Sequence, residues 1–234
     1  MIFDPPLLPA RLIRRYKRFL ADMVLEDGRE IVAHCPNPGS MLGLAEPGSR
    51  CWLSAKTGKG RKLDFGWEIV ETASGALVGI NTGYANRIVA EALAAGKLPG
   101  LPTDGTWRPE VKFGTGTRFD FAHEAADGKI TYLEVKSVTL SREPGLAEFP
   151  DSRTERGAKH LRALSAAFAL GHRAILLFLV QRDDCDRLAV AADIDPAYQA
   201  ALTLARGQGA ELQAYHCSIA PTGISLAKPV TFLP

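Results

Sequence analysis

Two segments decide how the second half of this chain folds: Arg118-Phe119-Asp120-Phe121 and Tyr132-Leu133-Glu134-Val135-Lys136. Both are short and contain aromatic or branched side chains, which predicts two strands. Side chains alternate between the faces of a strand, so Glu134 and Lys136 project together. We expect Leu133, Val135 and also Tyr132 to point to the other side. One carboxylate and one amine therefore share a face of the predicted sheet.

The turn between these strands decides whether Asp120 can join that pair. Asp127-Gly128 is the strongest hairpin signal in the connecting segment. A two-residue turn there would set Asp120 opposite Val135, on the wrong face. A three-residue turn over 126–128, with Gly128 in the left-handed conformation, sets Asp120 opposite Glu134. A site shared by the two acids and the lysine therefore requires the three-residue turn.

The three side chains predict a metal-assisted phosphodiester hydrolysis. Asp120 and Glu134 offer hard oxygen ligands to Mg²⁺ or Mn²⁺, with the carbonyl of Val135 and water completing the shell. Such an ion lowers the pKa of an attacking water and offsets phosphate charge. Lys136 would orient or deprotonate the water, or stabilise the oxyanion. The alternative is that Glu134 and Lys136 form an ordinary surface ion pair.

Three further residues are candidates near this site. Glu91 lies on a helix predicted over 86–95 and can point at the metal, although it can equally be a solvent-facing glutamate. Glu110 competes for the same role. Arg118 lies two residues before Asp120, so it would grip a phosphate or neutralise the acidic cluster.

Composition places the chain among soluble globular proteins. It has 234 residues, 46% hydrophobic and 23% charged, and its longest apolar run, 174–180, has the length of a buried strand. We expect a bacterial cytoplasmic protein without a signal peptide or membrane span. The four cysteines are widely spaced, which favours reduced, buried thiols. His34-Cys35 could ligate a soft metal, but a turn shaped by the prolines and glycine of 36–39 is the favoured interpretation.

Positive charge is concentrated near the N-terminus. Residues 1–62 carry eleven Lys/Arg and six Asp/Glu, whereas the remainder carries seventeen and twenty. The cations form two groups, with Tyr16 and Phe19 interleaved in the first: Arg11, Arg14, Arg15, Lys17 and Arg18, then Lys56, Lys59, Arg61 and Lys62. Cations with stackable rings suit nucleic acid, and the alternative is a solvated face. Any polyanion should meet this part of the chain first.

A third group of cations lies at the start of a predicted long helix. Ser152 or Thr154 can cap this helix, and Gly171 ends it. The first turn is rich in groups that could hold a DNA phosphate at the helix N-terminus: Arg153, Arg156 and Lys159. The alternative is a capped, solvated first turn. We expect His160 to be a hydrogen-bonding partner and not a metal ligand, because no second histidine follows at i+4.

The pattern of elements changes near residue 81. Before it, five strands are predicted with glycine and proline punctuation and no clear helix: about 13–25, 29–35, 49–55, 66–72 and 76–81. This pattern favours a small barrel of the OB type. After it, helix and strand alternate: a helix over 86–95, strands near 109–113, 117–123 and 130–137, the long helix, a strand over 173–180, a helix over 196–206 and a strand over 210–217.

This order of elements, with Asp and Glu-x-Lys on the second and third strands, resembles the core of the PD-(D/E)XK nuclease superfamily. A closer resemblance, to the sugar fermentation stimulation protein A family, covers nearly the whole chain. It depends on four strings, residues 15–22, 34–37, 133–140 and 149–161. Pro38 departs from the family pattern, where threonine is expected.

The resemblance implies an α+β protein in two parts: an OB-like DNA-binding barrel over 1–81 and a nuclease-like domain with a mixed sheet over 82–234. It also implies DNA binding with little sequence preference and a regulatory role in sugar metabolism, notably of maltose. Two hypotheses follow, a Mg²⁺- or Mn²⁺-dependent deoxyribonuclease and a catalytically silent DNA-binding regulator. An RNA-binding or protein-interaction module is a third. No Walker or Rossmann motif is present, so we predict no nucleotide cofactor.

Overall fold

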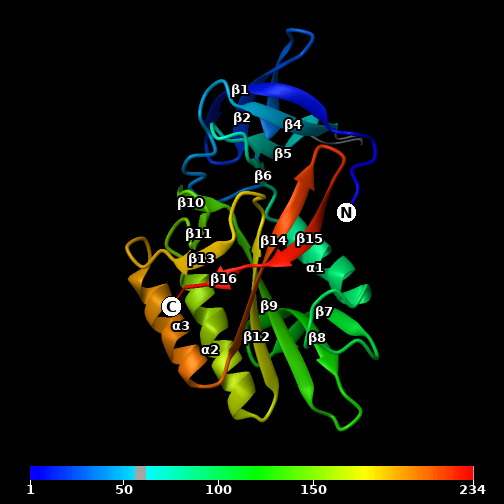
Figure 1. Cartoon of the computed structure of the whole chain (residues 1–234), viewed down its shortest axis with the longest axis vertical. Coiled ribbons are helices and arrows are strands. Elements are labelled where there is room, and N and C mark those ends of the chain that lie inside the picture. The colour runs from blue at the N-terminus through cyan, green and yellow to red at the C-terminus, as the bar shows by residue number, and fades with distance from the viewer. Residues whose placement is uncertain (56–61, 234) are drawn as a thin grey trace.

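The computed structural model describes residues 1–55 and 62–233, and Figure 1 shows a barrel at one end of an α/β part. In the barrel, β1 pairs with β2 and β4, and β5 pairs with β4, β3 and β6. The β3–β5 pairing closes β1 to β5 into a ring, which confirms the predicted OB-like fold. Its strands are β1 (Leu8–Tyr16), β2 (Leu20–Leu25), β3 (Glu30–His34), β4 (Arg50–Ala55), β5 (Phe65–Glu71) and β6 (Leu77–Gly79).

The segment predicted as one strand over 13–25 is two strands joined by a tight turn. Lys17 and Arg18 have φ values of 46° and 64°, and Tyr16 pairs with Leu20 across the turn. Two consecutive residues in the left-handed region reverse the chain direction within a three-residue loop, 17–19. Glycine or asparagine normally marks such a turn, and neither is present here, so the prediction of a single strand was wrong.

The second part is built on a mixed six-stranded sheet in the order β15-β14-β12-β9-β8-β7. A second, four-stranded sheet in the order β10-β11-β13-β16 was not predicted. The elements are α1 (Tyr84–Ala94), β7 (Trp107–Phe113), β8 (Thr117–Glu124), β9 (Ile130–Val138), β10 (Leu140–Glu143), β11 (Leu146–Phe149), α2 (Glu155–Ala169), β12 (Arg173–Val180), β13 (Arg187–Val190), α3 (Pro196–Gly207), β14 (Glu211–Ala220), β15 (Gly223–Pro229) and β16 (Thr231–Phe232).

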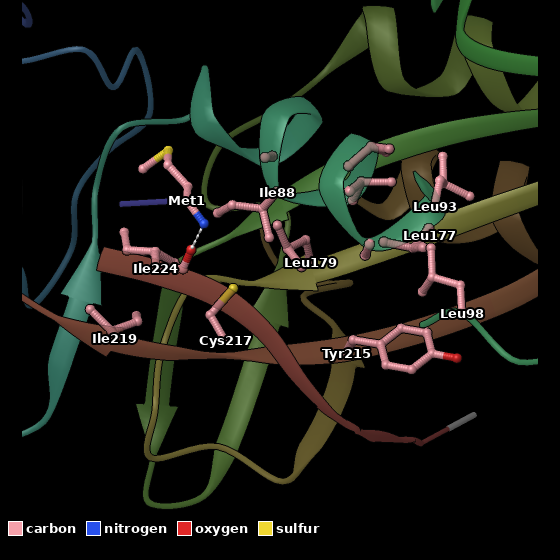
Figure 2. Packing of buried hydrophobic residues seen from close by; sticks show 14 of the residues in the cluster. Met1, Ile88, Leu93, Leu98, Leu177, Leu179, Tyr215, Cys217, Ile219 and Ile224 are labelled. Carbon is pink, nitrogen blue, oxygen red and sulfur yellow. Dashed lines mark hydrogen bonds between the residues drawn. The ribbon is translucent and has the colours of Figure 1, made fainter. Parts of the chain in front are cut away.

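Helices cover both faces of the large sheet. Strand β12 is apolar from Ala174 to Val180, so its alternate residues supply two cores. Leu177 and Leu179 pack with α1 residues such as Ile88, and Figure 2 shows this cluster around Met1 and the β14–β15 hairpin. Leu176 and Phe178 pack on the opposite face with α2 and α3. The predicted buried strand over 173–180 is confirmed.

The hairpin between β8 and β9 has the register that the site requires. Phe121 pairs with Leu133, Glu124 pairs with Ile130, and Gly128 has a φ of +80°. The loop is therefore the three-residue turn over 126–128, which is confirmed. Tyr132 was assigned to the wrong face. It packs with Phe119 on the α2 side, because residue 132 shares its face with residue 134 in an alternating strand.

Other local predictions are confirmed in part. Thr154, and not Ser152, caps α2, because its side chain accepts a hydrogen bond of 3.0 Å from the Gly157 amide. All four cysteines are buried and unpaired. Within the described residues, no helix has the length and apolar character needed to cross a membrane.

Candidate functional site

A cleft of about 530 Å³ lies where the barrel meets one end of the large sheet. The β8–β9 pairing ends at Phe121 and Leu133, and the residues just beyond that pair line the cleft. The sheet contributes four of the predicted residues to its wall: Asp120, Glu134, Val135 and Lys136. The barrel contributes Arg18 and the segment 37–39, which come from two turns. The structure thus brings the predicted acids and lysine together.

Asp120 is held by contacts on both of its carboxylate oxygens. Oδ1 accepts a hydrogen bond of 2.7 Å from Nδ2 of Asn86 on α1, and Oδ2 accepts one of 2.7 Å from the Val135 amide. Burial, followed by the negative charge of Glu134, raises the pKa of the Asp120 carboxyl above its ordinary value. A nearby cation would offset both of these effects.

Glu134 is the more deeply buried acid, with 2% of its side chain exposed. Its Oε1 accepts a hydrogen bond of 2.7 Å from Nζ of Lys136 and also contacts Nδ1 of His160 on α2. Burial alone would raise the pKa of Glu134, but the hydrogen bond to His160 and the charge of Lys136 together lower it below its ordinary value. The expected hydrogen-bonding role of His160 is therefore seen, and the Glu134–Lys136 pair differs from an exposed surface ion pair.

The donor set at this point fits a small divalent cation. Oε2 of Glu134 is buried and has no hydrogen-bond partner among the described residues, which is costly for a charged oxygen. Asp120 lies close enough for the charge of Glu134 to raise its pKa, and Val135, whose amide donates to Asp120, lines the same cleft. Within residues 1–55 and 62–233, no group of three or more His, Cys, Asp or Glu side chains is gathered for a metal. Mg²⁺ does not need such a group, because it keeps several waters and takes one or two carboxylates.

Glu91, a predicted further ligand, is engaged elsewhere. Its carboxylate lies 2.6 Å from the Met1 amine and 3.5 Å from Nε of Arg87. Within the described part of the chain, it does not line the cleft. The residue of α1 that reaches the site is Asn86, one and a half turns earlier. Glu110 lines a second pocket and not the cleft, in a backbone conformation with a φ of 52°.

Arg15, a predicted nucleic-acid contact, has a structural role instead. Its guanidinium donates hydrogen bonds to the backbone carbonyls of Arg18, Asn37, Gly39 and Ser40, at 3.0 to 3.2 Å. These four bonds hold the segment 37–40 against the β1–β2 turn. Four of the five N–H donors that could grip a phosphate are therefore already used, and the expectation for Arg15 is corrected.

The other predicted basic residues are distributed over two adjoining pockets. Arg153 and Arg156 line the cleft together with Arg18. Arg156 also lines a second pocket of about 550 Å³ with Arg118 and Lys159, whose Nζ donates to the Gly116 carbonyl at 2.7 Å. Lys17 and Lys62 are exposed outside both pockets. The predicted contacts Lys59 and Arg61 lie outside the described residues.

Asn37 is a feature of the cleft that sequence reasoning missed. Asn37 is only 2% exposed, and its Oδ1 accepts a hydrogen bond of 2.8 Å from the Gly39 amide. Within the described residues, Nδ2 is buried without a partner. Cys35, two residues earlier, is buried in the barrel core. The string 34–37 therefore shapes a turn, as favoured, but it also presents a polar group at the cleft.

Comparison with protein families covers both parts of the chain. The family model for the SfsA N-terminal OB domain matches residues 13–80, and the model for the sugar fermentation stimulation protein RE domain matches residues 83–223. The chain belongs to the SfsA family.

Relatives extend the likeness over the full length. A sugar fermentation stimulation protein homolog from Ruegeria pomeroyi is 55% identical over 97% of this chain and 99% of the relative. One from Rhodospirillum centenum is 52% identical over 97% of both chains. The structure of Pyrococcus furiosus SfsA in complex with Ca²⁺ matches with a TM-score of 0.88 over 100% of this chain and 98% of that chain. At 24% identity, this likeness shows the same fold.

Proposed function

We propose that this SfsA-family protein binds DNA and hydrolyses its phosphodiester bonds with Mg²⁺ or Mn²⁺ held by Asp120 and Glu134. The observation that carries the proposal is the buried Glu134 carboxylate, which has an unpartnered oxygen beside Asp120 at the base of a cleft lined by arginines. The Pyrococcus furiosus SfsA structure is a complex with Ca²⁺, a hard cation of the same ligand preference, which supports a cation site in this chain.

Each residue of the cleft has a distinct task in this reaction. A cation bound at the two carboxylates and the Val135 carbonyl supplies charge neutralisation and a more acidic water. Asn86 and the Val135 amide fix the Asp120 carboxylate, and His160 fixes that of Glu134. Lys136, whose Nζ already hydrogen bonds with Glu134, is placed to orient the attacking water or to stabilise the oxyanion.

The proposed path of the DNA strand follows the arginines. Arg156 lines both pockets, so a strand in the cleft can continue past it toward Arg118 and Lys159. These contacts are to phosphates, because guanidinium and ammonium groups match phosphate oxygens and carry no base preference by themselves. Binding should therefore have little sequence preference and should weaken steeply with salt.

The test is incubation of purified protein with single- and double-stranded DNA and Mg²⁺ or Mn²⁺. We expect cleavage by the wild type, loss of cleavage in Asp120→Ala and Lys136→Ala, and retained DNA binding in both. Asp127→Ala, in the exposed β8–β9 turn, is the control and should cleave normally. Absence of cleavage with either metal would favour the catalytically silent regulator.

The name of the family suggests a role in sugar metabolism. We propose that the DNA-binding activity underlies it, and that maltose-related genes are among those affected. The test compares transcripts in a strain that lacks the gene, complemented with the wild type or with Asp120→Ala. Rescue by both would assign the regulation to binding, and rescue by the wild type alone would assign it to hydrolysis. Rescue by neither would contradict the role.

A further inference from the structure

The buried amide of Asn37 requires a partner that the described part of the protein does not supply. A side-chain amide has two donor hydrogens, and leaving a buried donor unpaired costs about 1 to 3 kcal/mol. The identity of the free atom is fixed, because Oδ1 must be the atom that accepts from the Gly39 amide. Nδ2 therefore remains as an unpaired buried donor on a residue that lines the cleft.

A cation from the barrel lies in the same wall. Arg18 occupies the second left-handed position of the β1–β2 turn, where asparagine or glycine would be less strained. Its backbone carbonyl is tied to Arg15, and within residues 1–55 and 62–233 its guanidinium has no hydrogen-bond or ion-pair partner. A strained backbone that presents an unpaired charge at a cleft is typical of a functional position.

Another wall of the cleft comes from the segment that precedes α2. Arg153 is exposed, lines the cleft, and likewise has no partner in the described part of the chain. The two walls touch, because a Cβ on Gly39 would lie 2.0 Å from Oδ2 of Asp151. Asp151 is the opposing charge at this point, and the Ser152 hydroxyl donates to its Oδ1 at 3.2 Å. Two arginines and an amide donor outweigh this one carboxylate.

We propose that Arg18, Asn37 and Arg153 form a phosphate subsite built across the barrel and the nuclease-like part. Its ligand is a backbone phosphate of a nucleic-acid strand, next to the phosphate that a cation at Asp120 and Glu134 would hold. The subsite rests on the proposed function, since it requires the strand to lie in the cleft. Two guanidinium groups and one amide supply directed donors for phosphate oxygens. The barrel is then part of the active site, and not a separate DNA-binding module.

The variants are chosen to preserve the fold. Asn37→Asp keeps the oxygen that accepts from the Gly39 amide and replaces the free donor with an acceptor. Arg18→Asn removes the cation while tolerating the left-handed turn. Arg153→Ala removes an exposed side chain without fold contacts. Arg162→Ala, at an exposed position of α2 outside both pockets, is the matched control for charge.

The measurement is the affinity for a fluorescent single-stranded oligonucleotide without divalent metal, so that no cleavage occurs. We expect each of the three variants to lose about tenfold in affinity, and Arg162→Ala to bind like the wild type. For Arg18→Asn and Arg153→Ala, the slope of log affinity against log salt should fall by about 0.7. The wild type should bind an oligonucleotide with one neutral methylphosphonate linkage at the bound phosphate more weakly than the unmodified oligonucleotide. Arg18→Asn and Arg153→Ala should bind the two oligonucleotides with equal affinity.

If all three variants have the same affinity and the same salt slope as the wild type, the proposed subsite is wrong. Thermal melting of each variant separates lost binding from lost folding, and Arg153→Ala keeps the test valid if a barrel variant is unstable. The result is independent of hydrolysis. If the variants bind more weakly and no protein cleaves DNA, the subsite is supported and the proposed nuclease activity is contradicted. If the wild type cleaves DNA and the variants bind normally, the nuclease activity is supported and the subsite is contradicted.

Discussion

At the scale of single residues, the site depends on buried polar groups whose partners come from distant parts of the chain. Glu134 on β9 meets His160 on α2, and Asp120 on β8 meets Asn86 on α1. Each acid therefore contacts a helix on a different side of the sheet. The short sequence motif predicts which acids matter, but it cannot predict these partners, because helix rotation is set by core packing.

Glu91 illustrates that limit. A glutamate on the helix before the strands was the natural candidate for an additional ligand, yet rotation of α1 by its buried residues Ile88 and Ala92 directs Glu91 to the Met1 amine. Asn86 reaches the site instead. Arg15 was misjudged for a similar reason. A cluster of cations predicts positive charge on one region, but it does not reveal which guanidinium groups are already bonded to carbonyls.

Arg15 gives a stability prediction at this scale. Arg15→Ala should destabilise the protein by about 2 to 3 kcal/mol, because four carbonyls of the β1–β2 turn and the segment 37–40 lose a charged donor. Urea unfolding would measure the change. Arg14→Ala, which breaks an exposed pair with Asp22 on the next strand, should have little effect. Equal losses in the two variants would contradict the structural role of Arg15.

At the scale of elements, the β8–β9 hairpin could be predicted because its turn carries a direct signal. Asp127-Gly128 marks the turn, and only a three-residue loop there puts Asp120 and Glu134 on the same face. The pairing of Phe121 with Leu133 confirms this loop. The β1–β2 turn carries no such signal, since two cationic residues occupy left-handed positions. The small sheet of β10, β11, β13 and β16 was also missed, because strands of two to four residues are too short for a periodic pattern.

The turn between α3 and β14 provides a matched pair of glycines. Gly209 has a φ of +102°, and a Cβ there would lie 2.3 Å from Cζ of Phe168. Gly207 has a helical conformation with nothing within 4 Å of an added Cβ. Gly209→Ala should therefore cost about 2 kcal/mol or more, whereas Gly207→Ala should be neutral or stabilise by up to about 1 kcal/mol. Thermal melting tests the pair, and a stable Gly209→Ala would refute the strain argument.

At the scale of the whole molecule, the two parts share a core. Trp52 and Ile69 of the barrel belong to the same cluster as Leu93 of α1 and Leu177 of the large sheet. Strand β6 of the barrel also contacts the second part, because the Gly79 amide donates to the Gln181 carbonyl at 2.9 Å. The change in pattern near residue 81 is the basis for the predicted boundary between the two parts. It could not predict this junction, which depends on residues far apart in the sequence.

Buried thiols in the shared core and in the barrel core give the stability of the protein a pH dependence. Burial raises the pKa of Cys51 and of Cys217 to about 12, from an ordinary value of 9.0. Between these values the folded protein keeps protons that the unfolded chain releases. The free energy of unfolding should be unaffected by these thiols below about pH 9 and should fall above it, by about 1.4 kcal/mol per pH unit for each thiol.

Urea unfolding across this alkaline range tests the effect. The variant Cys51→Ala/Cys217→Ala should be less stable at neutral pH, since its core loses volume, but its stability should fall less steeply above about pH 9. Identical alkaline slopes in the two proteins would show that the thiols do not contribute.

Calorimetric titration with Mn²⁺ measures whether Asp120 and Glu134 together hold a divalent cation. We predict one site in the wild type and in the Asp127→Asn control. Asp120→Asn and Glu134→Gln should each bind at least about tenfold more weakly, because each removes one of the two charged ligands. No binding by the wild type, or equal affinity in all four proteins, would show that these two carboxylates do not hold the ion.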